Sequence, residues 1–282
     1  MLKICADSTC DLSQELITQY GITIIPLHIV LDDKEYRDGI DITQEEIFEW
    51  ADKNKTTPKT SAVSFPDAMA AVKPMVDAGD ELILFTIASG MSTTSNVFRM
   101  VAEDLEAEDK IHVVDSQNLS TGIGLLVIEA AEMAKAGLGA EDILNEIARL
   151  IPKVRSSFVI DTLTYLARGG RCSSMAALTG GMLKIHPKII VKDGKMEVSK
   201  KYRGQIKAVT MDYVKDMHYA LLAARPERIF VTHTSNNREL VEEVKSYLEG
   251  LGYFEKIYET RAGGVISSHC GPGTLGVLFI EG

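Results

Sequence analysis

The sequence has few cysteines, and no two of them are closely paired. Cys5, Cys10, Cys172 and Cys270 form no Cys-x-x-Cys motif. Zinc sites and thiol–disulfide motifs usually need that closer spacing, so the pattern speaks against both. We interpret the four cysteines as reduced thiols, some of them buried.

Excess positive charge and long apolar runs are also missing. Thirty Lys and Arg residues stand against forty Asp and Glu residues, which gives a net charge of −10. Nucleic-acid binding needs a basic face, so we expect no nucleic-acid partner, and the lack of a helix-turn-helix pattern disfavours a transcription regulator. No segment reaches the roughly 18 to 20 apolar residues of a membrane helix. Asp7 comes too early for a signal peptide, so we expect a cytoplasmic protein without a membrane span.

Three catalytic or nucleotide-binding signatures are missing as well. The chain contains no G-x-x-x-x-G-K-[ST], no H-E-x-x-H and no G-x-S-x-G. Gly271, Gly273 and Gly276 match G-x-G-x-x-G, but this segment leads into a final strand instead of opening a helix. We therefore expect no cofactor and no metal site, and any phosphoryl transfer would need a partner that brings the nucleotide.

The composition is that of a globular protein with one large domain or two ordinary ones. The chain has 282 residues, of which 45% are hydrophobic and 25% charged. Its first 160 residues alternate apolar strands with amphipathic helices, which predicts parallel βαβ units with helices on both faces. We expect strands over 2–6, 22–31 (bent at Pro26), 81–87 and 111–115, and helices up to Tyr20 and over 43–53, 66–78, 92–105, 116–136 and 140–151. We expect 55–65 to be a polar loop.

The pattern changes near residue 158, and we place a domain boundary there. Asp193-Gly194 lies between the segments 188–192 and 196–201 and predicts a hairpin. We expect further strands over 158–161, 229–232, 256–260 and 276–280, helices over 207–222 and 238–248, and small helices within 163–183. The predicted fold is α/β with two domains: a parallel-sheet domain over 1–157 and an α+β domain over 158–282.

Two loops are unusually rich in hydroxyl groups. One is Ala88-Ser89-Gly90-Met91-Ser92-Thr93-Thr94-Ser95, where a predicted strand turns into a helix. Helix N-termini offer free N–H groups to anions, and hydroxyl groups add donors that suit a carboxylate or phosphate. The other runs from Thr56 to Ser64. There Ser64 is expected to cap the next helix, which leaves Thr60 and Ser61 without a local role.

Acidic and basic candidates complete the set. Asp7 follows the first strand and Asp11 lies four residues later, which fits a turn and a helix cap but also a metal-dependent phosphatase or hydrolase that would use His269 as well. Arg171, in the segment 166–171, and Arg203 suit the recognition of a carboxylate or phosphate, or a contact with a protein partner.

Taken in order along the chain, these segments resemble the DegV family. The resemblance rests on six segments: Asp7-Ser8-Thr9-Cys10-Asp11-Leu12, Thr60-Ser61, Ser89-Gly90-Met91-Ser92-Thr93-Thr94, Val114-Asp115-Ser116, Leu163–Arg171 with its Gly169-Gly170-Arg171, and Gly271-Pro272-Gly273-Thr274-Leu275-Gly276. The resemblance implies a non-enzymatic protein that binds a long-chain fatty acid in a tunnel between two domains. It also implies that the protein presents the carboxylate to a partner ATP-binding subunit of fatty acid kinase, which converts it to an acyl phosphate.

The resemblance also assigns roles to individual residues. Thr60 and Ser92 would hold the carboxylate, Ser61 and His269 would complete the polar network, and Arg171 and Arg203 would face the kinase. Apolar candidates for the tunnel are Met91, Phe98, Met182 and Ile266. The chain departs from the family pattern at Ala62-Val63 and at Thr93, beside the expected carboxylate site.

Overall fold

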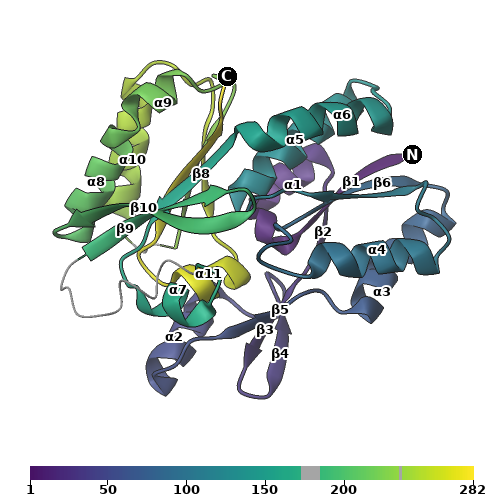
Figure 1. The fold of residues 1–282 in the computed structure, drawn as a ribbon, viewed down its shortest axis with the longest axis horizontal. Helices are drawn as coiled ribbons and strands as arrows, with labels where there is room; N and C mark the ends of the chain where they lie inside the picture. The colour runs from purple at the N-terminus through teal and green to yellow at the C-terminus, as the bar shows by residue number, and fades with distance from the viewer. Residues whose placement is uncertain (173–184, 235–236) are drawn as a thin grey trace.

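A computed structural model describes residues 1–172, 185–234 and 237–282. A four-stranded parallel sheet, in the order β2-β1-β6-β7, organises the N-terminal part. Its strands are β1 (Leu2–Asp7), β2 (Thr23–Ile25), β6 (Glu81–Thr86) and β7 (Ile111–Asp115). The predicted parallel sheet is confirmed. Because all four strands run in the same direction, their carboxyl ends share one edge, which faces the centre of the molecule (Figure 1).

Helices cover both faces of this sheet, as predicted. Leu82 and Leu84 of β6 point to one face and pack with Phe98, whereas Ile83 and Phe85 point to the other face, because side chains alternate along a strand. The helices of this part are α1 (Gln14–Tyr20), α2 (Gln44–Asn54), α3 (Phe65–Asp77), α4 (Thr94–Asp104), α5 (Thr121–Lys135) and α6 (Ala140–Leu150), with short 3-10 helices η1 (Ser8–Cys10) and η2 (Ile151–Lys153).

A six-stranded mixed sheet, in the order β10-β9-β8-β13-β11-β12, forms the C-terminal part. Its strands are β8 (Val154–Val159), β9 (Ile185–Lys192), β10 (Lys195–Arg203), β11 (Ile229–His233), β12 (Ile257–Arg261) and β13 (Leu275–Ile280). On its outer face lie α8 (Ile206–Asp216), α9 (His218–Leu222) and α10 (Arg238–Gly250) (Figure 1). The mixed sheet confirms the predicted fold class. The predicted boundary at residue 158 falls inside β8, and the division into two domains stays a prediction.

A third, small sheet lies between these parts at the base of the molecule (Figure 1). It has the order β4-β3-β5 and consists of β3 (His28–Leu31), β4 (Lys34–Arg37) and β5 (Lys59–Ser61). We expected one bent strand over 22–31, but the chain leaves the parallel sheet after β2 and enters this sheet after Pro26. Proline lacks the N–H that a continuous ladder needs, so the break falls there. The segment 55–65 was wrongly expected to be only a loop, since it contains β5.

Three further elements differ from the expectations. The expected single helix over 207–222 is divided at Met217 into α8 and α9, and the expected strand over 158–161 begins four residues earlier, at Val154. The segment around His269 is not a loop but the helix α11 (Gly264–Cys270). Within 163–183 the structure describes α7 (Thr164–Gly169), and residues 173–183 of this expectation lie outside the described residues.

The hairpin at Asp193-Gly194 is confirmed. Both residues have positive φ angles, 49° and 71°, as the tight turn between β9 and β10 requires. Across the described ranges, no helix is long and apolar enough to cross a bilayer.

Candidate functional site

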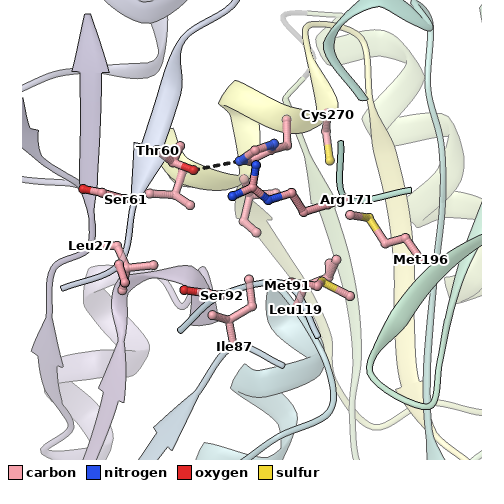
Figure 2. Close-up of a pocket in the computed structure, with 14 residues that line it drawn as sticks. Leu27, Thr60, Ser61, Ile87, Met91, Ser92, Leu119, Arg171, Met196 and Cys270 are labelled. Carbon is pink, nitrogen blue, oxygen red and sulfur yellow. Dashed lines mark hydrogen bonds between the residues drawn. The ribbon is translucent and has the colours of Figure 1, made fainter. Parts of the chain in front are cut away.

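A pocket lies where the parallel sheet, the small sheet and α11 meet. Its space not filled by atoms amounts to about 510 Å³, including its opening to solvent. Figure 2 shows Thr60 and Ser92 on one side and Arg171, Met196 and Cys270 on the other. The lining residues are Leu27, Thr60, Ser61, Ala62, Ile87, Met91, Ser92, Leu119, Arg171, Met196, Val265, Ile266, His269 and Cys270. The pocket therefore combines segments from both halves of the sequence.

Thr60 and Ser61 are neighbours in β5, but their hydroxyl groups have different partners. Thr60 Oγ1 lies 2.8 Å from His269 Nε2, a contact drawn as a dashed line in Figure 2. Ser61 Oγ donates instead to Glu35 Oε1 at 3.0 Å, on the neighbouring hairpin. Consecutive side chains of a strand point to opposite faces, which explains the difference. Of these two hydroxyl groups, only that of Thr60 is joined to His269.

His269 is neutral at physiological pH. Burial of its ring, together with the charge of Arg171, lowers its pKa to about 4. Its Nδ1 is buried without a hydrogen-bond partner among the described residues. Gly169 packs directly against this nitrogen, since a Cβ at Gly169 would lie only 2.3 Å from Nδ1. A buried N–H without an acceptor is costly, so the favoured tautomer carries its proton on Nε2. In that tautomer His269 donates to Thr60 Oγ1, and the Thr60 hydroxyl proton is available to a ligand.

Ser92 precedes helix α4 and lines the same pocket. Its Oγ lies 2.9 Å from the hydroxyl of Thr94 and accepts the backbone N–H of Thr94 at 3.3 Å. We expected this helix to begin at residue 92, but it begins at Thr94, which leaves Ser92 in the turn that lines the pocket. Either hydroxyl can donate in the contact between Ser92 and Thr94; when Thr94 donates, Ser92 has its own proton free for an acceptor in the pocket.

The two arginines occupy different places. Arg171 lines the pocket with Thr60, Ser92 and His269, and its Nη1 donates to the carbonyl oxygen of Gly169 at 2.7 Å. Its guanidinium group brings a positive charge to the polar side of the pocket. Arg203 is exposed at the end of β10 and is not among the lining residues.

A second, apolar pocket adjoins this one at the mixed sheet. The two cavities share Leu119, Ile266 and Cys270. The second cavity is further lined by Phe158, Leu278 and other residues of the mixed sheet. Among the apolar candidates from the sequence, Met91 and Ile266 line the first pocket, Phe98 lies instead in the core between α4 and the parallel sheet, and Met182 lies outside the described residues.

Asp7 is buried away from His269. One of its carboxylate oxygens accepts from Thr9, and the other accepts the backbone N–H of Ile87 at 2.8 Å. Burial raises its pKa to about 6. Within the described ranges no group of three His, Cys, Asp or Glu side chains could hold a metal ion.

Asp11 has a structural environment of the same kind. Its carboxyl group bonds to Ser120 and to the backbone N–H of Gly263. Neither Asp7 nor Asp11 lines the pocket that contains His269. The three residues of the alternative enzyme hypothesis are therefore not brought together in one site.

Sequence patterns did not identify several lining residues. Leu27 directly precedes β3 and Met196 lies in β10, far apart in the sequence, and only the tertiary fold brings them together. Asp38, which follows β4, is buried although nothing in its local sequence indicates this. Asp38 forms hydrogen bonds with Ser8 and Gly264, which lie far from it in the sequence, so local sequence patterns do not reveal its burial.

Comparison with known proteins identifies the family. A profile described as "Uncharacterised protein, DegV family" matches residues 1–282. The chain belongs to the DegV family. A DegV domain-containing protein of Caldanaerobacter subterraneus is 33% identical over 99% of both chains. This result confirms the family resemblance that the six sequence segments predicted.

Solved structures extend the family relationship to the whole fold. A fatty-acid-binding DegV family protein from Thermus thermophilus has a TM-score of 0.91 at 28% identity, with 99% of each chain covered. A stearic acid-binding protein from Eubacterium ventriosum has a TM-score of 0.84 at 28% identity, with 100% of this DegV chain and 98% of the other covered. DegV from Bacillus subtilis, described as a fatty acid binding protein, has a TM-score of 0.85 at 27% identity, with 100% of this chain and 99% of that one covered.

Proposed function

We propose that this DegV chain binds one long-chain fatty acid and presents its carboxylate to a partner ATP-dependent fatty acid kinase. The observation that carries the proposal is a pair of neighbouring pockets, which share Leu119, Ile266 and Cys270 and give the site a polar end and an apolar end. The polar end holds Thr60, Ser92 and Arg171, and the apolar end lies beyond Ile266 at the mixed sheet. The fatty acids bound by similar solved structures support the same ligand class.

The carboxylate takes the polar end. A carboxylate that leaves water needs charge-assisted hydrogen bonds. The hydroxyl groups of Thr60 and Ser92 both have a proton to donate, and Arg171 supplies the compensating positive charge. His269 supports this arrangement from behind, because it occupies the acceptor side of the Thr60 hydroxyl. Ser61, whose hydroxyl bonds to Glu35, contributes to the shape of the strand.

The tail takes the apolar end. About fifteen methylene groups at about 0.8 kcal/mol each contribute on the order of 10 kcal/mol gross. The loss of ligand freedom on binding removes part of that amount. The remaining free energy is enough for a tightly held lipid that co-purifies with the protein.

The kinase partner supplies the chemistry that this chain lacks. The sequence carries no phosphate-binding loop of the G-x-x-x-x-G-K-[ST] type. In the proposed reaction a carboxylate oxygen attacks the γ-phosphorus of ATP on the partner, ADP leaves, and the acyl phosphate stays with this chain. Arg203, which is exposed on β10, is the residue that we assign to the contact with the kinase.

Native mass spectrometry of the purified protein, followed by denaturing extraction, tests the binding step. We expect a mass excess of one fatty acid that is released on denaturation. Ser92→Ala should weaken binding of added palmitate by about 1 to 3 kcal/mol, because a partner of the carboxylate is lost. A protein that is empty and takes up no palmitate contradicts the proposal, and turnover of phosphoesters by the chain alone would favour the hydrolase hypothesis.

A further inference from the structure

Helix α11 carries His269 and Ile266 into the pocket, yet its first turn has no capping side chain of its own. The residue before the helix is Gly263, which has no side chain to accept a hydrogen bond. Two carboxyl groups from distant parts of the sequence take over this role. The backbone N–H of Gly263 donates to Asp11 Oδ1 at 2.8 Å, and that of Gly264 donates to Asp38 Oδ1 at 2.7 Å.

The two carboxyl groups lie against the same glycine. A Cβ at Gly263 would lie 3.1 Å from Asp11 Oδ1 and 3.3 Å from Asp38 Oδ2. Both aspartates are buried, at 5% and 3% exposure. Two carboxylates that are buried so close together cannot both ionise without a large electrostatic cost. One proton shared by the pair removes that cost.

The hydrogen bonds favour Asp11 as the residue that holds the proton. Ser8 Oγ accepts the backbone N–H of Leu27 at 3.1 Å and donates its own proton to Asp38 Oδ2 at 2.8 Å. Asp38 also accepts from the backbone N–H groups of Gly264 and Val265, so three donors stabilise its ionised form. Asp11 accepts from two donors, the hydroxyl of Ser120 and the backbone N–H of Gly263, and because a hydroxyl can also accept, the bond to Ser120 persists when Asp11 is protonated.

The hydrogen bond between Asp11 and Ser120 connects Asp11 to a second segment beside the pocket, the turn before α5. Ser120 has φ 54° and ψ −145°, a strained conformation for a residue other than glycine. Its neighbour Leu119 lines both the polar pocket and the apolar cavity. Asp11 therefore joins the start of α11 to the strained turn that places Leu119.

We propose that Asp11 and Asp38 are positioning residues for the fatty-acid site: Asp11 carries a shared proton, Asp38 carries the charge, and together they hold α11 so that His269 faces Thr60. The inference rests on the proposed function. This role of Asp11, in the acidic segment after β1, requires neither a bound metal ion nor a nucleophilic aspartate.

Other ionisable groups around the pair are consistent with one retained proton. Burial raises the pKa of both Asp11 and Asp38, and for Asp11 the charges of Asp38 and Asp7 add to the effect. Asp7 adds negative charge from β1, and the thiols of Cys10 and Cys270 are neutral because burial raises their pKa. Arg261, at the end of β12, lines the same surface cleft as the two aspartates.

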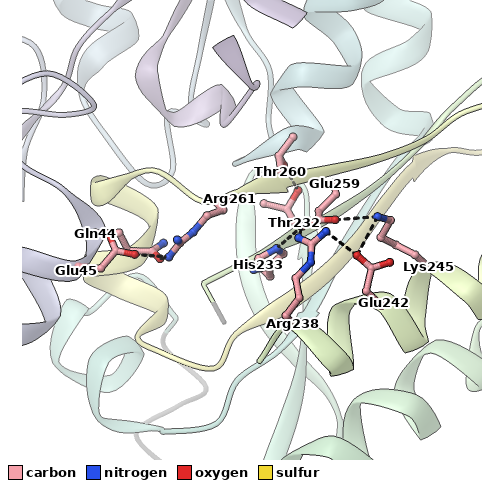
Figure 3. A network of polar contacts seen from close by, with 10 residues as sticks. All are labelled: Gln44, Glu45, Thr232, His233, Arg238, Glu242, Lys245, Glu259, Thr260 and Arg261. Carbon is pink, nitrogen blue, oxygen red and sulfur yellow. Dashed lines mark hydrogen bonds and ion pairs between the residues drawn. The ribbon is translucent and has the colours of Figure 1, made fainter. Parts of the chain in front are cut away.

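Arg261 is also held by helix α2. Its guanidinium group bonds to Gln44 and pairs with Glu45, as Figure 3 shows. Gln44 in turn donates to Ala262 O and Ser267 Oγ, which ties α11 to α2 independently of the carboxyl pair. The start of α11 is therefore held by two separate sets of contacts.

Asparagine variants separate the two aspartates, because Asn resembles a protonated Asp. The experiment measures palmitate affinity of the whole protein at pH 7.5, with exposed Asp109→Asn as the matched control. Asp11→Asn should bind within about twofold of wild type, whereas Asp38→Asn should bind at least tenfold more weakly. At higher pH, wild-type affinity should fall as Asp11 ionises, and Asp11→Asn should not show this fall. Equal losses in both variants, or no loss in Asp38→Asn, would overturn the proposal.

Infrared spectroscopy of the protein without palmitate locates the proton independently of whether a variant binds the ligand. At pH 8, above the pKa of about 6 for Asp7, the infrared band of a protonated carboxyl group should be present in wild type and absent in Asp11→Asn. If the band persists in Asp11→Asn, the proton assignment is wrong. If wild-type protein itself takes up no palmitate, the proposed function fails, and the infrared band still decides where the proton lies.

Discussion

At the scale of single residues, Thr60 and Ser61 show how strand geometry separates two chemically similar side chains. Both residues line the pocket, but the Thr60 hydroxyl lies against His269 and the Ser61 hydroxyl donates to Glu35. Thr60→Val keeps the shape of the side chain and removes its hydroxyl. We expect palmitate affinity to fall by about 1.5 to 3 kcal/mol, roughly tenfold or more, because a hydrogen bond to a charged group is lost.

Ser61→Ala is the matched control, because it removes a hydroxyl one position along the same strand. Its palmitate affinity should equal that of wild type in isothermal titration calorimetry. Equal losses in the two variants would mean that β5 acts through its stability and not through the Thr60 hydroxyl.

The pKa of His269 gives a second prediction at this scale. Its folded-state value of about 4 lies below the ordinary 6.5, so protonation disfavours the folded protein. The stability contributed by neutral His269 is complete above pH 6.5 and is lost as the pH falls toward 4. Relative to His269→Gln, wild type should therefore become less stable across this window in urea unfolding without ligand. The buried Asp7 titrates in both proteins, so its effect cancels in the difference.

An NMR titration of the histidine ring protons checks the cause directly. The His269 resonances should not titrate between pH 5 and 8. A midpoint near 6.5 would contradict the neutral ring on which the Thr60 hydrogen bond depends.

At the scale of elements, the β9–β10 hairpin touches the hydroxyl loop that carries Ser92. A Cβ at Gly90 would lie 2.7 Å from the carbonyl oxygen of Gly194 at the hairpin tip, and Met196 of the same hairpin lines the pocket. Gly90→Ala should therefore push the hairpin away from the loop. We expect faster palmitate release in stopped-flow measurements and a lower melting temperature.

Gly139→Ala controls for the general effect of replacing a glycine. Gly139 precedes α6 with an ordinary φ of −75°, and a Cβ there would meet no atom within 4 Å. Its release rate should match that of wild type. An unchanged rate in Gly90→Ala would show that contact with the hairpin does not limit release.

The elements also show what the sequence could predict. Periodicity and capping identified the parallel sheet and its helices, and the helix expected over 43–53 begins with a capping box of Thr43 and Glu46. Short elements gave no periodic signal: β5 has three residues and α11 has seven. These two elements carry Thr60 and His269. The residue types of the site could therefore be predicted, whereas the pairing of Thr60 with His269 depends on long-range packing.

At the scale of the whole molecule, helix α5 joins the two large sheets. The parallel sheet packs on one side of it and the mixed sheet on the other, so its first eleven residues are all buried. A helix enclosed in this way is apolar around its whole circumference. The exception is Glu129, which meets Arg228 at the start of β11, with Arg228 Nη1 and Glu129 Oε1 2.9 Å apart. The two parts of the protein thus share one core and one buried ion pair.

Breaking this pair should destabilise the whole protein. Arg228 and Glu129 are 8% and 9% exposed, and burial raises the pKa of Glu129 despite its partners. Arg228→Met leaves a buried carboxylate with only Arg225 beside it, so we expect a loss of about 3 kcal/mol in urea unfolding. Arg149→Met, which breaks an exposed pair with Glu146, should cost under about 1 kcal/mol.

The double variant tests whether the cost comes from the unpaired charge. Glu129→Leu combined with Arg228→Met replaces the pair by apolar side chains and should recover most of the lost stability, since buried ion pairs are often exchanged at little cost. Because α5 belongs to both parts, each variant should unfold in one transition whose midpoint shifts. Two separate transitions would show that the parts unfold independently, and a double variant as unstable as Arg228→Met would show that arginine packing, not charge, holds the junction together.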